Sequence, residues 1–533
     1  MRGGSNRVLF GTWQGPCGRA MTMRRSELAA ALSLAADAAH GAMAEHQLRV
    51  SIMAARLALQ LKLPERERRE CYDAALLRWL GCTGTAQLLS GWMGDEIEDH
   101  RHTLHFAGPL DPLLELVRYA GAGMDLPHRL LVLLDALRAG PGAVFGSTCE
   151  ASTELADRLG YEPEVVAALG LAFERFDGKG WPGKLRGDGV PIAAQVAMLA
   201  DDAVALADFD GEGPAMEEIR RRAGSHYNPD LVATLTAVAP GVFAEFVGAD
   251  AWSLSAASDP EPDRFVAPEA VVDVLTALAD FVDLKVPGLA GHSRGVAELA
   301  AAAAVELGES AETIALLRQS GLVHDLGRVT VPNNVWTSAG PLSSAQRESV
   351  RLCPYYGERF FARSSWLAPL GAIGTQYQER LDGSGYHRGL TAAAIGRPAR
   401  VLQAADCYRA LIEDRAHRAA LTPEAAAEHV RNEARAGRLD PDAVEAVIAG
   451  AGQRARVRRA NPAGLTAREV EVLGLLAQGL PNKRIASVLV VSSRTVGTHV
   501  AHIYDKIGVA TRAGATLFAL RHDLVATSVK RPM

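Results

Sequence analysis

Two histidines and two aspartates in the second half of the chain have the types and setting of a metal site. His324 and Asp325 are adjacent in an apolar stretch, His292 lies upstream and Asp406 lies downstream. Imidazole and carboxylate groups bind divalent transition metals, which activate water and neutralise phosphate oxygens. A His-Asp pair alone is weak evidence, because most such pairs are surface residues or helix caps. The apolar flanks, the two separate ligands and the glycine-rich loop ERLDGSGY (379–386) favour a metal site.

The composition predicts a mainly α-helical globular protein with more than one core. The chain has 533 residues, of which 48% are hydrophobic, 22% charged and only 6% aromatic, and one core rarely organises a chain of this length. The sequence contains neither a membrane-length apolar stretch nor a signal peptide, so we expect a cytoplasmic protein without a membrane partner. Six scattered cysteines without a C-x-x-C pair predict free thiols.

A diverged internal repeat divides the first 450 residues. The segment AALLRWLGC, around Arg78, matches SGLVHDLGR, around His324, at an offset of 246 that also relates His46 to His292. FERFDGKGW matches QERLDGSGY at an offset of 205, which also relates Asp201 to Asp406. Helical spacing between these blocks predicts that each repeat is a helical bundle.

Changes of composition predict the domain boundaries. A Ser-, Asp- and Pro-rich stretch and a Gly- and Arg-rich stretch interrupt the periodic segments and are interpreted as linkers. The expected order is a disordered segment at 1–23, repeat 1 at 24–246, a linker at 247–266, repeat 2 at 267–450, a basic linker at 451–463 and a C-terminal domain at 464–528.

Residues 267–450 resemble the HD-GYP subgroup of the HD-domain phosphohydrolases. The matching segments are GHSRGVAELA, LVHDLGRVTVP, ERLDGSGYHRGL and RVLQAADCYRAL. The resemblance implies an all-helical fold that binds two or three metal ions and hydrolyses cyclic dinucleotides. The chain departs from that family pattern at Gly288, Arg328, Cys353, Tyr377, Gln378 and His387.

The retained ligands His292, His324, Asp325 and Asp406 are the minimal one-metal set of the wider HD superfamily. We therefore expect at most one divalent ion, iron, manganese or similar, in repeat 2. Arg328 keeps the positive charge of the family lysine and is a candidate phosphate contact.

Repeat 1 has lost more of the site. Its His-Asp pair is replaced by Arg78 and Trp79, so His46 and Asp201 are interpreted as polar core residues. Repeat 1 is expected to pack against repeat 2, or to bind a ligand without cleaving it.

The last eighty residues are basic and have the pattern of a helix-turn-helix. Residues 454–533 hold thirteen Lys and Arg against four acids, within a chain of formal net charge −6. Thr466 to Glu469 is a capping box that begins one helix, 482–489 predicts a second, and Ser492 or Ser493 caps a third that runs to about Ile507. The exposed side of the third helix is small and basic, which suits the DNA major groove.

This segment resembles the LuxR-type helix-turn-helix along GLTAREVEVLGLLAQGLPNKRIASVLVVSSRTVGTHVAHIYDKIGV. The expected fold class is thus mainly α, with two HD-domain-like helical bundles followed by a four-helix LuxR-type domain. The resemblance implies phosphate contacts from Lys483, Arg494, Thr495 and Lys506, and base-facing positions at Gly497, Thr498 and Ala501.

The sequence therefore predicts a dimeric transcriptional regulator that binds double-stranded DNA. Its HD-GYP-like region would sense a signal, with a nucleotide as a possible ligand, or hold the dimer together. The alternative is a single-metal phosphohydrolase that acts on a cyclic nucleotide or phosphoester and carries a DNA-binding domain.

Overall fold

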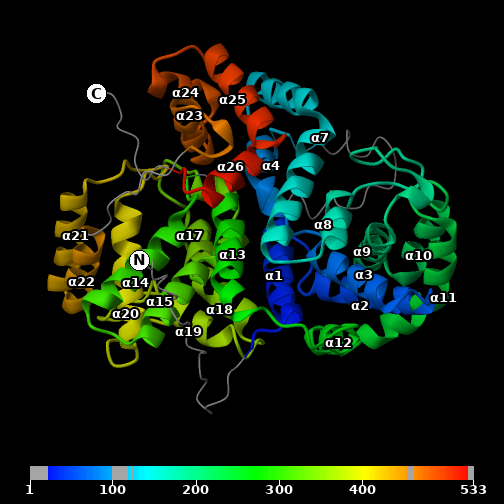
Figure 1. Cartoon of the computed structure of the whole chain (residues 1–533), viewed down its shortest axis with the longest axis horizontal. Helices are drawn as coiled ribbons and strands as arrows, with labels where there is room; N and C mark the ends of the chain where they lie inside the picture. Colours follow the sequence, from blue (N-terminus) through cyan, green and yellow to red (C-terminus); the bar gives the residue numbers. More distant parts are fainter. Residues whose placement is uncertain are drawn as a thin grey trace, which may run out of the picture.

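The computed structural model describes residues 22–98, 118, 120–121, 124–286, 288–452 and 461–525. Within these residues the chain forms helices, and only isolated bridges pair extended backbone. Figure 1 shows two helical bundles side by side and a smaller helical unit above the seam between them. The prediction of a mainly α fold is confirmed.

The internal repeat is visible in the positions at which helices begin. Helices α2 (His46–Gln60) and α14 (His292–Glu306) begin 246 residues apart, as do α3 (Glu65–Leu77) and α15 (Ala311–Val323). Helices α9 (Ile192–Asp210) and α20 (Arg397–Leu411) begin 205 residues apart. The two sequence offsets therefore correspond to equivalent helices.

Each bundle closes around its repeated helices. The other helices of the first bundle are α1 (Arg25–His40), α4 (Ala86–Met93), α7 (Leu126–Arg158), α8 (Pro163–Gly170), α10 (Glu212–Arg221), α11 (Pro229–Phe246) and α12 (Ala251–Ser258). Those of the second are α13 (Val271–Lys285), η4 (Leu326–Thr330), α16 (Asn333–Trp336), α17 (Ser344–Arg351), α18 (Cys353–Phe361), α19 (Ala368–Gly374), α21 (Pro423–Arg435) and α22 (Pro441–Gly452).

The glycine-rich loop has the same construction in both repeats. In repeat 1 the carboxylate of Glu174 accepts backbone N–H groups of Lys184 and Leu185 at 2.7 and 3.3 Å. In repeat 2 Glu379, at the equivalent position, accepts those of Arg388 and Leu390, both at 2.8 Å. The conserved geometry shows that this loop is architectural in both repeats.

The two bundles share one hydrophobic core, to which α1 and α13 both contribute. A buried ion pair lies at the seam, where Lys285 Nζ is 3.0 Å from Glu96 Oε1. Glu96 also accepts the backbone N–H of Asn333 at 2.9 Å, and Lys285 Nζ donates to the carbonyl of Ala39 at 3.3 Å. These contacts join α1, the segment directly after α4, α13 and α16, so the repeats form a single packed body.

The C-terminal unit consists of α23 (Ala467–Ala477), α24 (Asn482–Leu489), α25 (Ser493–Ile507) and α26 (Arg512–Arg521). The predicted capping box at Thr466 is present, with its hydroxyl accepting the Glu469 N–H at 3.2 Å. Ser492 caps α25, which decides between the two candidate serines. The helix-turn-helix predicted from the sequence is therefore confirmed.

The structure corrects the expected local structure at two boundaries. The segment 247–266 contains α12, which packs against α2, and its buried Ser255 bonds with Ser51 at 2.8 Å. Pro260 and Pro262 lie after the last residue of α12, so they limit the length of the helix but do not prevent it from forming. Met23 is buried and its carbonyl accepts the Val266 N–H at 2.9 Å, so the expected disorder does not extend to this residue. Residues 1–21 and 453–460 lie outside the described residues.

No single helix among the described residues is long and apolar enough to cross a membrane. Two halves of α7, Leu126–Gly140 and Gly142–Arg158, pass that test together by length and composition only, with a bend of 59° between them.

Candidate metal centre and nucleic-acid interface

Three segments of repeat 2 carry the four predicted metal ligands. His292 is the first residue of α14, and Asp406 lies on α20. His324 and Asp325 lie at the junction where α15 ends and η4 begins, so the apolar stretch that holds them is not one continuous helix. The break in the helix turns both side chains toward the other two ligands.

The four ligand atoms converge on one point. His292 Nε2 lies 3.4 Å from Asp325 Oδ2 and 3.3 Å from Asp406 Oδ1. His324 Nε2 lies 3.3 Å and 3.6 Å from the same two oxygens. Ligand atoms that surround a transition metal at about 2.1 Å are separated by roughly 3.0–3.5 Å, so these spacings fit one ion.

Buried atoms without hydrogen-bond partners provide a second test of the fit. His292 Nε2, His324 Nε2, Asp325 Oδ2 and Asp406 Oδ1 are all buried and make no hydrogen bond. Buried polar atoms are rarely left without a partner, because each costs its desolvation free energy. Two imidazole nitrogens and two carboxylate oxygens that face one another are a donor set that suits a divalent transition metal.

Glu413 orients the first ligand. The Nδ1 atom of His292 donates to Glu413 Oε2 at 2.8 Å, which leaves Nε2 free to act as the ligand. Burial opposes the charged form of His292, but Glu413 and Asp406 raise its pKa to about 9. Arg409 and Arg415 in turn bond to Glu413 at 2.6 and 3.0 Å.

Arg328 occupies the other side of Asp325. Its Nε lies 2.7 Å from Asp325 Oδ1, while Oδ2 faces the two histidines. The guanidinium also stacks on Trp336, with 5.4 Å to the ring centroid. One oxygen of the aspartate is thus available to an ion and the other is already paired with a cation.

The replaced family ligands line the same side of the site. Tyr377 packs edge-on against His324, with ring centroids 4.9 Å apart, and Cys353 is buried nearby. Burial raises the pKa of the Cys353 thiol to about 12, which favours the neutral thiol. The surroundings of Arg328 therefore offer a guanidinium, a phenol and a neutral thiol where a second ion would require anionic or imidazole ligands.

Repeat 1 fills the equivalent site with its own side chains. Asp201 accepts hydrogen bonds from His46 Nε2 at 2.9 Å, Arg78 Nε at 2.9 Å, Gln47 Nε2 at 3.1 Å and Trp79 Nε1 at 3.2 Å. The carboxylate is therefore satisfied within the protein, and Arg78 provides the positive charge that an ion would supply. This arrangement agrees with the interpretation of His46 and Asp201 as polar core residues.

The ionisation of repeat 1 follows from these contacts. Burial alone would lower the pKa of His46, but its bonds to Asp201 and Asp208 raise it to about 9. Burial would raise the pKa of Asp201, but His46 and Arg78 hold it well below its usual range. Both groups are thus charged near neutral pH, as an internal ion cluster requires.

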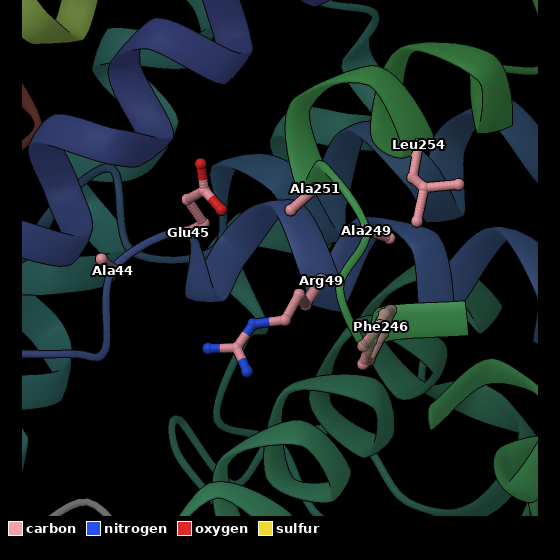
Figure 2. Close-up of a pocket in the computed structure, with 7 residues that line it drawn as sticks. All are labelled: Ala44, Glu45, Arg49, Phe246, Ala249, Ala251 and Leu254. Carbon is pink, nitrogen blue, oxygen red and sulfur yellow. The ribbon is translucent and has the colours of Figure 1, made fainter. Parts of the chain in front are cut away.

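A half-open hollow of about 270 Å³ lies next to this cluster and not at the repeat 2 site. Figure 2 shows the Arg49 side chain extending from α2 between Ala44 on one side and Phe246 on the other. Arg49 is already paired with Asp208 at 2.7 Å. The hollow therefore presents no uncompensated charge that would assign it a ligand.

The predicted DNA-contacting residues lie on α24 and α25. Lys483, Arg494, Thr495, Thr498 and Ala501 are exposed, and Gly497 is half-buried. Val496 and Ile503, on the opposite side of α25, are fully buried in the core of the C-terminal unit. The structure thus leaves the predicted reading side of α25 open to solvent.

Lys506 is also exposed but is already engaged within the domain. Its Nζ lies 2.7 Å from Glu469 Oε2 and 3.3 Å from the carbonyl of Gly464. The sequence did not indicate this pairing, which ties the end of α25 to the start of α23. A phosphate contact from Lys506 would have to compete with Glu469.

Comparison with known families assigns both regions. Residues 276–443 match the family described as HD domain, and residues 463–519 match the bacterial regulatory proteins of the luxR family. The chain carries an HD domain followed by a LuxR-type DNA-binding domain. This combination supports a DNA-binding regulator with an HD-GYP-like region.

Characterised relatives match different parts of the chain. The 3'3'-cGAMP-specific phosphodiesterase 3 of Vibrio cholerae is 26% identical over 408 residues, which cover 75% of this chain and 89% of the relative. The cyclic di-GMP phosphodiesterase response regulator RpfG of Xanthomonas campestris is 30% identical, covering 34% of this chain and 48% of its own. The response regulator VraR of Staphylococcus aureus is 43% identical over 61 residues, covering 11% of this chain and 29% of its own.

A solved structure agrees with the fold of the two-repeat region. The crystal structure of a cyclic GMP-AMP specific phosphodiesterase from Vibrio cholerae superposes with a TM-score of 0.58 at 22% identity, covering 82% of this chain and 99% of that chain. At this identity the likeness bears on the fold. HD domains of this kind are typically dependent on divalent metals, which agrees with the buried His-His-Asp group.

The residues that support the metal ligands were not predicted from the sequence. Glu413, Arg409 and Arg415 were not singled out, although Glu413 follows Asp406 by seven residues, or two helical turns. Asp283 was also missed; it caps α14 by accepting the Ser293 N–H at 3.1 Å and the Ser293 hydroxyl at 2.8 Å. The spacing of Glu413 was the one sequence signal available for these groups.

Replacing Arg78 by alanine tests the internal cation of repeat 1. The buried carboxylate of Asp201 would lose its guanidinium partner, and removing one partner of a buried pair costs about 3–5 kcal/mol. We expect the lowest-temperature unfolding transition in calorimetry to shift down by several degrees. Arg66→Ala removes an exposed arginine of the same bundle and should leave that transition nearly unchanged. Equal shifts for the two variants would contradict this account.

Proposed function

We propose that this protein is a transcriptional regulator whose HD domain holds at most one divalent metal ion and senses a ligand. His292, His324, Asp325 and Asp406 would hold the ion. The pairing of Asp325 Oδ1 with Arg328 carries the proposal, because it leaves one carboxylate oxygen for one ion. When bound, the ion would supply positive charge that lowers the pKa of a water and attracts a phosphate.

The charges around the site favour an anionic ligand. The carboxylates of Asp325, Asp406 and Glu413 are balanced by the guanidinium groups of three arginines. A divalent cation that displaces the proton of His292 would therefore still add net positive charge to these groups. Two relatives from Vibrio cholerae are named as 3'3'-cGAMP-specific phosphodiesterases, which supports a cyclic dinucleotide as the ligand. Arg328 is the candidate for contact with a phosphate of this ligand. The arginines that support the proposal are Arg328, Arg409 and Arg415.

The alternative is a phosphohydrolase that uses the same single ion. The four-ligand set and the similarity to one cGAMP-specific phosphodiesterase over 75% of the chain favour it. Against rapid hydrolysis stands the lack of second-ion ligands around Cys353 and Tyr377, since two-metal enzymes stabilise attacking and leaving oxygens together. The metal ion would be iron, manganese or a similar divalent ion in either case.

Metal content tests the one-ion site, and turnover of a cyclic dinucleotide separates the regulator from the enzyme. We expect purified protein that has been saturated with Mn²⁺ and desalted to hold no more than one ion per chain, because Cys353, Tyr377 and Gln378 stand where the family places further ligands. Asp325→Ala should remove that ion, whereas Asp382→Ala, an exposed carboxylate of the glycine-rich loop, should retain it. Mass spectrometry of the metal gives the stoichiometry. Two tightly held ions, or turnover of a cyclic dinucleotide at about 1 s⁻¹ or faster, would favour the enzyme.

The DNA-binding proposal has its own test. Lys483→Ala in the full chain should weaken binding to a mixed-sequence duplex at low salt, because a phosphate contact is sequence-independent. It should also flatten the log–log salt dependence by about one unit. Arg435→Ala removes an exposed arginine of the HD domain and should change neither property. Fluorescence anisotropy over a range of salt concentrations measures both, and identical slopes would contradict the contact.

We further propose that the protein works in the cytoplasm as a homodimer on double-stranded DNA. Five leucines on the first half of α7 are each between 47% and 71% exposed, and four of them follow one another at intervals of four, four and three residues. Two copies that cover this side of the helix would bury on the order of 1,000 Å², the lower limit of a specific interface. The leucines are Leu126, Leu130, Leu131, Leu134 and Leu137.

Light scattering of a double variant tests this surface. Leu130→Glu with Leu134→Glu should convert the dimer to a monomer, because like charges would face each other at the centre of the interface. Leu59→Glu, at another exposed leucine, should leave the dimer intact. A wild-type monomer, or one that partitions onto phospholipid vesicles through this helix, would contradict the dimer proposal.

A further inference from the structure

Helix α26 belongs to two hydrophobic cores at once. Ala515 and Ala519 are buried in the core of the DNA-binding domain. Ala513, Leu517 and Leu520, spaced four and three residues apart on another side of the helix, are buried in the core shared by the two repeats. The helix lies against α7 of repeat 1 and α13 of repeat 2 (Figure 1). The DNA-binding domain is therefore docked on the HD region and not merely tethered to it.

A carboxylate from repeat 1 holds the N-terminal end of α26. Glu150 Oε1 accepts the backbone N–H of Ala510 at 2.9 Å, and Glu150 Oε2 accepts the hydroxyl of Thr511, the N-cap residue. A Cβ atom at Gly514 would meet this carboxylate at 2.5 Å, so the contact is closely fitted. A negative charge at this end also suits the helix dipole.

A guanidinium from repeat 2 holds the C-terminal end. Arg294 Nη1 donates to the carbonyl of Leu520 at 2.9 Å, which satisfies a carbonyl in the last turn of the helix. Arg294 is itself fixed by Asp280, whose carboxylate is fully buried and also pairs with Arg158 at 2.6 Å. Each end of α26 is thus held by a charge of the sign that its dipole favours, one from each repeat.

The second of these contacts arises from the turn that carries a metal ligand. Arg294 follows His292 by two residues in the first turn of α14. A Cβ atom at Gly291, directly before His292, would lie 3.6 Å from a methyl group of Leu520. The imidazole of His292 and the end of α26 therefore contact the same turn of backbone.

We propose that metal binding in the HD domain and docking of the DNA-binding domain are thermodynamically linked through the first turn of α14. This inference rests on the proposed metal site. An ion would tie α14, the α15–η4 junction and α20 together, which fixes the turn from which Arg294 reaches Leu520. The turn then holds α26 more firmly, and linkage requires that docking in turn strengthens metal binding. Occupancy of the HD domain would thereby set the orientation of the DNA-reading helix α25.

Hydrogen exchange of the full chain, with and without Mn²⁺, measures this linkage directly. We expect Mn²⁺ to slow amide exchange in 513–521 by about fivefold or more, the lower end of usual coupling. Arg294→Ala should still bind Mn²⁺ in calorimetry but lose this protection. Arg318→Ala, which removes an exposed ion pair between α15 and Glu298 of α14, should keep it.

A second variant covers the case in which Arg294→Ala does not fold. Glu150→Gln loosens the other end of α26, so it should speed exchange there in both metal states and, by reciprocity, weaken Mn²⁺ binding by no more than the same coupling factor. Bound Mn²⁺ without protection of α26 in the wild type would overturn the linkage while leaving the metal site standing. Failure of the wild type to bind Mn²⁺ would overturn both proposals together.

Discussion

A buried aspartate on the long inner helix of each repeat imposes the main constraint on this fold. Asp201 and Asp406 occupy equivalent positions, and a carboxylate removed from water must be neutralised or carry a large free-energy cost. Repeat 1 satisfies it with His46, Arg78 and Trp79. Repeat 2 keeps two imidazoles and a second carboxylate around Asp406 and leaves their inward atoms without hydrogen bonds. The buried carboxylate is thus balanced by protein side chains in repeat 1, and in repeat 2 it is left available to a bound ion.

The source of the positive charge at the site differs between the repeats, and this gives the repeats different roles. An internal guanidinium is covalently part of the chain, so repeat 1 has a permanent site charge that no change in metal supply can remove. Repeat 2 has a site whose charge depends on a bound ion. Because both repeats share one core and the ion pair of Lys285 and Glu96 joins them, the invariant repeat can act as a rigid support for the variable one.

The DNA-binding domain sits where both repeats can hold it. Glu150 comes from the invariant repeat and Arg294 from the turn beside the metal ligand, and α26 lies between them. The predicted reading side of α25 points away from this contact and stays exposed. Docking therefore does not cover the residues expected to meet DNA, and it can act on the orientation of the domain instead of blocking it.

The sequence by itself determined the helical class, the repeat, the helix-turn-helix and the four candidate ligands. Helical periodicity, caps such as Thr466 and Ser492, and constant offsets between the repeats are local or near-local patterns, which is why they can be read along the chain. Only the tertiary structure decided that His324 and Asp325 lie at a helix break, that 247–266 contains α12, and that Lys506 pairs with Glu469. It also decided the support from Glu413 and the sharing of α26 between two cores. These features depend on contacts between side chains that are far apart in the sequence. A local sequence pattern does not indicate which distant side chains will be in contact.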